Sequence, residues 1–136
     1  MGAQVVLDAA ADNVHTALAE ATDGRGVDVV FEAAGTDTGV GLAIEAARPG
    51  GRVILAGIPG QDSTTFPASV ARRKGLTLKL SRRMKEMYPR TIRLVDSGLV
   101  DMASVVSHTF PLEQVGEAFR AAGDRVGLKI IVSPSA

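Results

Sequence analysis

Residues 27–58 constrain the fold of this chain more than any other stretch, because they predict two buried strands joined by one helix. Val27–Phe31 is a short β-branched and aromatic run between glycine-containing turns, which is typical of a strand covered on both faces. Thr38–Ala47 carries apolar residues at helical spacing, and Arg52–Gly57 predicts a second buried strand. Such a unit is a right-handed parallel crossover, and open parallel sheets bind ligands beyond the carboxyl ends of their strands. The loops that follow the two strands are therefore the first places to look for function.

The limits of the central helix follow from the residues that flank it. Thr36 or Asp37 can cap its start, and the Pro-Gly-Gly sequence at 49–51 stops it. Gly39 and Gly41, near its start, half-fit the fingerprint of a dinucleotide-binding turn, but that fingerprint places its first glycine directly after the strand. We therefore interpret these two glycines as positions of close helix packing.

The remaining elements extend the same alternation of strands and helices. Further strands are predicted at Val5–Asp8, Leu76–Leu80, Val105–His108 and Lys129–Val132. Further helices are predicted within Ala9–Thr22, where Asp12 or Asn13 begins the helix, from Phe66-Pro67 to Gly75, from Tyr88 to Gly98, and from Pro111 through Ala122. In Leu76–Leu80 apolar and polar residues alternate, as expected of a strand at the edge of a sheet. The fold class is therefore α/β.

Composition limits what can be built on this framework. The chain has 136 residues, of which 46% are hydrophobic, so we expect one soluble, cytoplasmic domain. No apolar run approaches the roughly 20 residues that span a bilayer, and no secretory signal is visible, so no membrane partner is expected. The absence of cysteine excludes a disulfide framework and a thiolate zinc site. His15 and His108 lie far apart with no carboxylate at ligand spacing, so we expect no metal site. We interpret His15 as an exposed helix residue, because a base needs a partner and none is nearby in sequence.

The charges are unevenly distributed, although the formal net charge is zero. Arg72–Arg93, here termed the basic band, holds nine Lys or Arg residues and one acid, Glu86. Three interpretations stay open, in decreasing order of preference: a solvated helix face with a strand edge protected by Lys79, a site for the phosphates of a cofactor, and a nucleic-acid surface. Because Tyr88 is the only aromatic residue in the band, we expect no nucleic-acid partner.

Four blocks of sequence carry a resemblance to a known family: Gly26–Gly35, Arg48–Gly57, His108–Glu113 and Gly127–Ile131. In this order and spacing they resemble the C-terminal, cofactor-domain part of the zinc-type medium-chain alcohol dehydrogenases, closest to the sorbitol and threonine dehydrogenase branch. The resemblance covers essentially the whole chain. It implies a partial Rossmann fold, a doubly wound parallel sheet that lacks its first two strands, with 1–136 as a partial NAD(P)-binding domain and 104–136 as its C-terminal return segment.

The resemblance also implies an activity, which is hydride transfer between an alcohol or polyol and NAD or NADP. The family's zinc ligands and glycine fingerprint are missing from this sequence, so zinc would enter only through the missing catalytic domain. We therefore expect a piece of a larger enzyme, or a truncated reading frame, that is inactive by itself. The alternative is a stand-alone interaction module in which the basic band at 72–93 binds an anionic partner.

The resemblance further implies which residues approach the cofactor. The turn near the adenosine and ribose comprises Ala34, Gly35 and Thr36, and the backbone at the nicotinamide comprises Ala56, Gly57 and Ile58. The segment Ser81, Arg82 and Arg83 reaches the nicotinamide half, where its two cationic side chains could meet the phosphates, and Lys129 falls at a position that is cationic in relatives. A side chain at 57 would hold the nicotinamide ring away, which explains the glycine. For the three cations, plain surface charge is the alternative.

The resemblance implies a partner as well. Relatives pair the strand that matches Leu76–Leu80 with its copy across a two-fold axis, so we expect a homodimer through this edge. In that dimer Leu76, Leu78 and Leu80 would be buried from both chains, and Val5–Asp8 would cover the other flank of the sheet.

Overall fold

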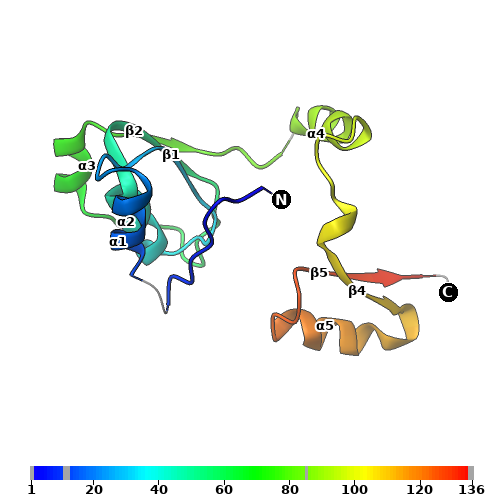
Figure 1. Ribbon diagram of the computed structural model, residues 1–136. Helices are drawn as coiled ribbons and strands as arrows, with labels where there is room; N and C mark the ends of the chain where they lie inside the picture. Colours follow the sequence, from blue (N-terminus) through cyan, green and yellow to red (C-terminus); the bar gives the residue numbers. More distant parts are fainter. Residues whose placement is uncertain (1, 11–12, 85, 135–136) are drawn as a thin grey trace. The chain divides into compact units, whose positions relative to one another are not determined.

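The computed structural model describes residues 2–10, 13–84 and 86–134 and separates into two compact units, Met1–Arg83 and Met84–Ala136 (Figure 1). The first unit contains α1 (Val14–Ala21), β1 (Val27–Glu32), α2 (Asp37–Ala46), β2 (Ala47–Leu55), α3 (Ala68–Lys74) and β3 (Thr77–Leu80). The second contains α4 (Met87–Asp96), a 3₁₀ turn (Ala103–Val105), β4 (Val106–Pro111), a second 3₁₀ turn (Leu112–Gln114), α5 (Val115–Gly123) and β5 (Lys129–Ser133).

The first unit is built on a three-stranded parallel sheet in the order β1-β2-β3. Val30, Val53 and Leu78 stand in register across it, and α2 and α3 pack over the face to which they point. Ile44 of α2 and Val53 of β2 are fully buried at the centre of this layer. The sequence prediction of a parallel strand-helix-strand unit, with the strand near Leu78 at an edge, is confirmed.

The opposite face of the sheet is much less covered than the sequence suggested. Phe31, which strand alternation directs to that face, is 72% exposed, and its neighbour Ile54 is half-buried. Glu32 is the one buried residue of β1. The expectation that both faces of β1 are covered is wrong, because α2 and α3 both pack on the face of Val30 and Val53.

The predicted strand at Val5–Asp8 is also wrong. These residues form no strand, Val6 is 84% exposed, and the Asp8 carboxylate accepts a hydrogen bond from the Ala10 backbone N–H (2.9 Å) in a turn. A strand needs a neighbour for its backbone groups, and in the described residues the sheet ends at β1. Of the two predicted caps for the following helix, Asn13 is the one observed; Asp12 lies outside the described residues.

The passage from α2 to β2 differs from the prediction in its boundary. Thr36 rather than Asp37 caps α2, accepting from the Gly39 N–H at 3.0 Å. β2 begins at Ala47, not at Arg52, and takes residues 48–51 into a bulge, since Val27 pairs with Ala47 whereas Val29 pairs with Arg52. The Pro-Gly-Gly sequence therefore shapes a bulged strand as well as ending the helix.

The helices that follow agree with the sequence patterns. α3 ends at Gly75 in the left-handed conformation (φ 60°), and α4 carries Pro89 in its first turn. In the second unit β4 and β5 run parallel on either side of α5 in the chain, as expected. Their pairing contains a bulge at Ser107, whose Oγ accepts from the Leu128 N–H at 2.7 Å.

Candidate functional site

Loops from all three strands of the first sheet meet at its carboxyl edge. The backbone N–H groups of Ala56 and Gly57 donate to the carbonyl oxygen of Glu32, at 2.8 and 2.9 Å. The Ser81 N–H donates to the carbonyl of Leu55 at 2.8 Å. The strands are parallel, so the segments 33–36, 56–58 and 81–83 emerge on the same side, as the sequence analysis expected. Lys129, the remaining predicted site residue, belongs to the second unit.

Two glycines allow these loops to approach each other. A Cβ on Gly35, whose φ is +69°, would lie 2.5 Å from the carbonyl oxygen of Ile58, and a Cβ on Gly57 would lie 2.2 Å from the Gly35 nitrogen. Neither obstacle is a flexible side chain. Glycine at 57 is thus already required by the contact between the loops, independently of any bound ring.

A buried carboxylate lies between the two loops. Glu32 is only 5% exposed, and its Oε1 accepts a hydrogen bond from the Gly35 N–H at 2.8 Å. Its Oε2 is 2.6 Å from the position of a Cβ on Gly57. The sequence analysis did not select this residue. The one available signal was its position at the end of a strand, directly before the loop of interest. Because β1 also contains Asp28, an acid in this strand does not by itself indicate burial.

The start of α2 is fixed to the loop that precedes α3. The Asp37 carboxylate accepts from both the N–H and the hydroxyl of Thr65, and the N–H contact is 2.9 Å long. These hydrogen bonds, the hydroxyl contact first, lower the pKa of Asp37 from its ordinary value. On the same helix a Cβ at Gly39 would lie 2.8 Å from Glu32 Oε1, which confirms close packing at this position. A Cβ at Gly41 would have nothing within 4 Å, so the prediction of close packing at Gly41 is wrong.

The cations of the basic band have different environments. The Lys74 ammonium donates to the carbonyl oxygens of Ile44, Glu45 and Ala47, at 3.2, 2.6 and 2.9 Å, and so closes the C-terminal end of α2. Arg82 and Arg83 are exposed at the carboxyl edge.

Other members of the band lie elsewhere. Arg90 and Arg93 belong to the second unit, and Lys85 lies outside the described residues. Lys74 therefore has a structural role, while Arg82 and Arg83 remain available to an anion.

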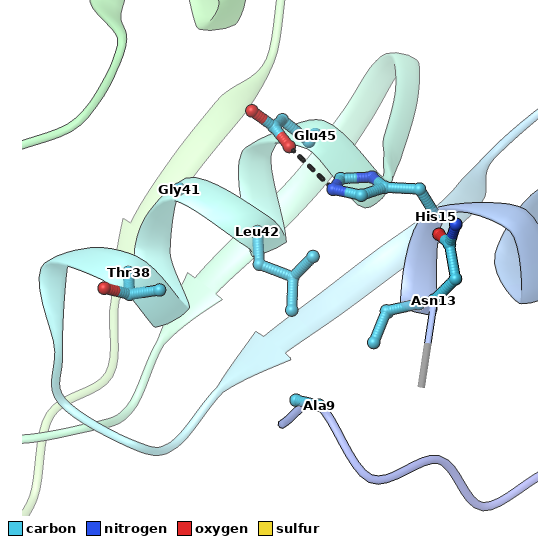
Figure 2. A pocket seen from close by; sticks show the side chains of 8 residues that line it. Ala9, Asn13, His15, Thr38, Gly41, Leu42 and Glu45 are labelled. Atoms are coloured by element: carbon cyan, nitrogen blue, oxygen red, sulfur yellow. Dashed lines mark ion pairs between the residues drawn. The ribbon is translucent and has the colours of Figure 1, made fainter. Parts of the chain in front are cut away.

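A groove of about 370 Å³ separates α1 from α2 (Figure 2). Figure 2 shows His15 of α1 reaching toward Glu45 of α2, with 3.2 Å between His15 Nε2 and Glu45 Oε2. The His15 side chain is 63% exposed, so its predicted exposure is confirmed. No partner was expected from nearby sequence, and the observed partner, Glu45, comes from the next helix.

Within 2–10, 13–84 and 86–134, no three His, Asp or Glu side chains gather in a way that could hold a metal ion. No helix in these ranges is long and apolar enough to cross a membrane.

Comparison with known proteins settles the family. Residues 1–97 match the model of a family described as zinc-binding dehydrogenase. The chain belongs to this family. It is 36% identical to D-xylulose reductase of Morganella morganii, over 80% of this chain and 32% of the relative, and 31% identical to L-threonine 3-dehydrogenase of Symbiobacterium thermophilum, over 98% and 39%. A solved alcohol dehydrogenase from Thermus sp. ATN1 superposes with a TM-score of 0.81 at 30% identity, over 91% of this chain and 36% of that one.

These matches confirm the family and the α/β, Rossmann-type fold class that the sequence blocks predicted. The chain spans between 25% and 39% of the length of the curated relatives that it matches.

Proposed function

We propose that this chain forms the nicotinamide side of the cofactor site in a zinc-type alcohol or polyol dehydrogenase that uses NAD or NADP. The observation that carries the proposal is the contact between Gly35 and Gly57, which joins two loops at the edge where parallel sheets bind ligands. Ala34, Gly35 and Thr36 would lie near the adenosine and ribose. When bound, the cofactor accepts or donates the hydride that is exchanged with the substrate carbon.

The residues at this edge fit such a group. Ala56 and Ile58 are exposed, and the Ile58 side chain, 64% exposed, offers an apolar surface beside glycine backbone. A planar ring can stack on such a surface because no side chain projects from positions 35 and 57. Arg82 and Arg83 leave the adjacent strand with exposed guanidinium groups, which suit phosphate oxygens. Lys129 belongs to the second unit, and its contact with the cofactor stays a prediction of the family resemblance. We assign no zinc ligand to this chain.

Titration with NADH and NADPH, followed by amide NMR, tests the proposal. We expect resonance shifts at 34–36, 56–58 and 81–83, with a dissociation constant weaker than about 10 μM. Affinity is expected to be weak because this sequence has no glycine-fingerprint helix for the pyrophosphate. Absence of shifts at millimolar cofactor, or shifts confined to other residues, would overturn the proposal.

Activity gives a second test. We expect the chain by itself to reduce neither NAD nor NADP in the presence of alcohols or polyols. We also expect it to bind no stoichiometric zinc, since this sequence does not contain the zinc ligands that the chemistry requires. Turnover above a heat-killed control, or one zinc per chain by elemental analysis, would contradict this assignment.

We further propose a two-fold homodimer through the free edge of β3, Thr77–Leu80. Leu80 is 79% exposed at this edge, whereas Leu76 and Leu78 already pack against the core of their own unit, so fewer leucines are free for the partner than the alternating pattern suggested. Light scattering should give a dimer at tens of micromolar, and Leu78→Pro should give a monomer. A monomeric parent, or a Leu78→Pro variant that is still the same dimer, would refute this interface.

A further inference from the structure

We propose that Glu32 is a positioning residue that fixes the two cofactor loops to each other, an inference that rests on the proposed function. Among the residues that the structure describes, Glu32 is the one polar or charged residue that is buried. Burial of a carboxylate is unfavourable unless the group is hydrogen-bonded. Its presence at the end of β1, where an apolar side chain would continue the strand pattern, therefore calls for a specific role.

Glu32 accepts hydrogen bonds from both loops. Its side-chain Oε1 accepts from the Gly35 N–H at 2.8 Å, in the loop after β1. Its backbone oxygen accepts from the N–H groups of Ala56 and Gly57, in the loop after β2. A bond from a backbone N–H to a carboxylate is stronger than one to a neutral acceptor. One residue thus determines where both loops begin.

The surrounding glycines leave room for this carboxylate. A Cβ at Gly39 would come within 2.8 Å of Oε1, and a Cβ at Gly57 within 2.6 Å of Oε2. Gly57 would also meet Gly35. The carboxylate therefore lies in a space bounded by glycine backbone, which a methyl group at position 39 or 57 would enter.

This arrangement bears on binding through preorganisation. A cofactor that spans both loops binds more tightly when their relative position is already set, because less conformational entropy is lost on binding. Glu32 has no need to touch the cofactor for this effect. Its substitution should lower affinity through the loops alone.

The alternative is a purely local role, in which the carboxylate only closes the turn at Gly35. The two roles differ in a measurable way. Loss of a local bond exposes the Gly35 amide and leaves the amides of Ala56 and Gly57 unchanged, because these donate to the backbone oxygen of Glu32. Loss of a positioning residue also exposes the two amides of the second loop.

Amide hydrogen exchange measured by NMR on the full chain decides between these roles. In Glu32→Ala we expect the amides of Gly35, Ala56 and Gly57 to exchange at least about tenfold faster, while the Ser81 amide, bonded to Leu55, changes by less than about threefold. Glu32→Gln retains an acceptor oxygen on a side chain of the same length, so most of the protection of these amides from exchange should be restored. Unchanged exchange at Ala56 and Gly57 in Glu32→Ala would overturn the proposal.

A second pair of variants keeps the test decisive if Glu32→Ala fails to fold. Gly39→Ala displaces the carboxylate by steric contact without removing it, and Gly41→Ala adds the same methyl group to the same helix in open space. We expect faster exchange at Gly35 and Gly57 in Gly39→Ala and parent rates in Gly41→Ala. Equal exchange in both variants would overturn the positioning role.

Titration of the same variants with NADH separates this inference from the function on which it rests. We expect Glu32→Ala to bind NADH about fivefold or more weakly than the parent, and Glu32→Gln to bind within about twofold of it. A second outcome is faster amide exchange in the loops of Glu32→Ala together with no NADH-induced shifts even in the parent. This outcome would overturn the proposed function, but it would support Glu32 as the residue that joins the loops. If NADH induced shifts in all variants and bound them with equal affinity, the positioning role would be refuted and the proposed function supported.

Discussion

The two ends of the same parallel strands are held by different physical means. At the carboxyl end, Gly35 and Gly57 are in backbone contact beside the buried carboxylate of Glu32. At the amino end, Asp28 forms ion pairs with Arg25 and Arg48, at 2.8 and 2.6 Å, and every side chain involved is at least 36% exposed. The carboxyl end therefore depends on the absence of side chains and on one buried carboxylate. The amino end combines exposed ion pairs with a glycine contact of its own, since a Cβ on Gly26 would lie 2.9 Å from the Ala46 carbonyl oxygen.

This difference matches the placement of the proposed site. A site that presents backbone to a planar ligand leaves little room for side chains, so its loops are fixed by close contact. The amino end adds exposed ion pairs, which are usually weak, to its glycine contact. Lys74, which closes the end of α2 beside Ala47, belongs to the same polar arrangement.

The largest effect is expected from adding one methyl group at the carboxyl end. Gly57→Ala places a Cβ 2.2 Å from the Gly35 nitrogen, and Gly35 cannot retreat without breaking its bond to Glu32. We expect a loss of about 1–3 kcal/mol in the free energy of unfolding, typical of overpacking, measured by urea denaturation.

The control for this variant lies in the same loop. Gly60 has nothing within 4 Å of its Cβ position, so Gly60→Ala should change stability by less than about 1 kcal/mol. If the two variants unfolded at the same urea concentration, the carboxyl end would not be tightly packed, and the contrast between the two ends would fail.

The next effect concerns the amino end. Lys74→Met retains most of the side-chain volume but removes the donor to three carbonyl oxygens at the end of α2. We expect a loss of about 1–2 kcal/mol, because those carbonyls lose a charged partner near the helix terminus. Arg73→Met, one residue earlier in α3 and exposed, should be close to neutral by the same denaturation measurement. Equal losses in the two variants would indicate a general effect of charge removal.

Sequence patterns predicted the elements whose cause is local. The strand-helix-strand unit, the edge position of β3 and the left-handed Gly75 after α3 all follow from hydrophobic spacing and turn residues. The family followed from blocks of such residues in order, and the matches confirm it. The gathering of loops 33–36 and 56–58 at one edge followed from the parallel topology.

The features that sequence reasoning missed depend on contacts between distant residues. Val5–Asp8 has the composition of a strand, but these residues form no strand in the structure. The start of β2 shifted to Ala47, where Arg48 meets Asp28 across the bulge. Burial of Glu32 depends on Gly57 from another loop, and nothing in the local sequence distinguishes a buried acid at a strand end from an exposed one.

The smallest effects should come from changes in pH and in salt concentration. They test whether the two ends of the parallel strands are stabilised by different kinds of charge interaction. The pKa of Asp28 is held well below its ordinary value of 3.8, chiefly by the hydrogen bonds from Arg25 and then Arg48, and the pKa of Asp37 is lowered by the donors of Thr65. A carboxyl whose pKa is lower in the folded state stabilises that state fully above 3.8, and this contribution is lost as the pH falls toward the folded pKa.

Both carboxyls should therefore contribute to a fall in the urea midpoint between about pH 5 and pH 3, and Asp28→Asn and Asp37→Asn should each flatten that fall. Salt distinguishes them. At about 1 M salt, where the Debye length is near 3 Å, the effect of Asp28→Asn should shrink because its partners are charged and exposed. The effect of Asp37→Asn should persist, since Thr65 is neutral. If the effect of Asp28→Asn had the same size at low and high salt, exposed charges would not stabilise the amino end. The two ends would then not differ in their charge interactions.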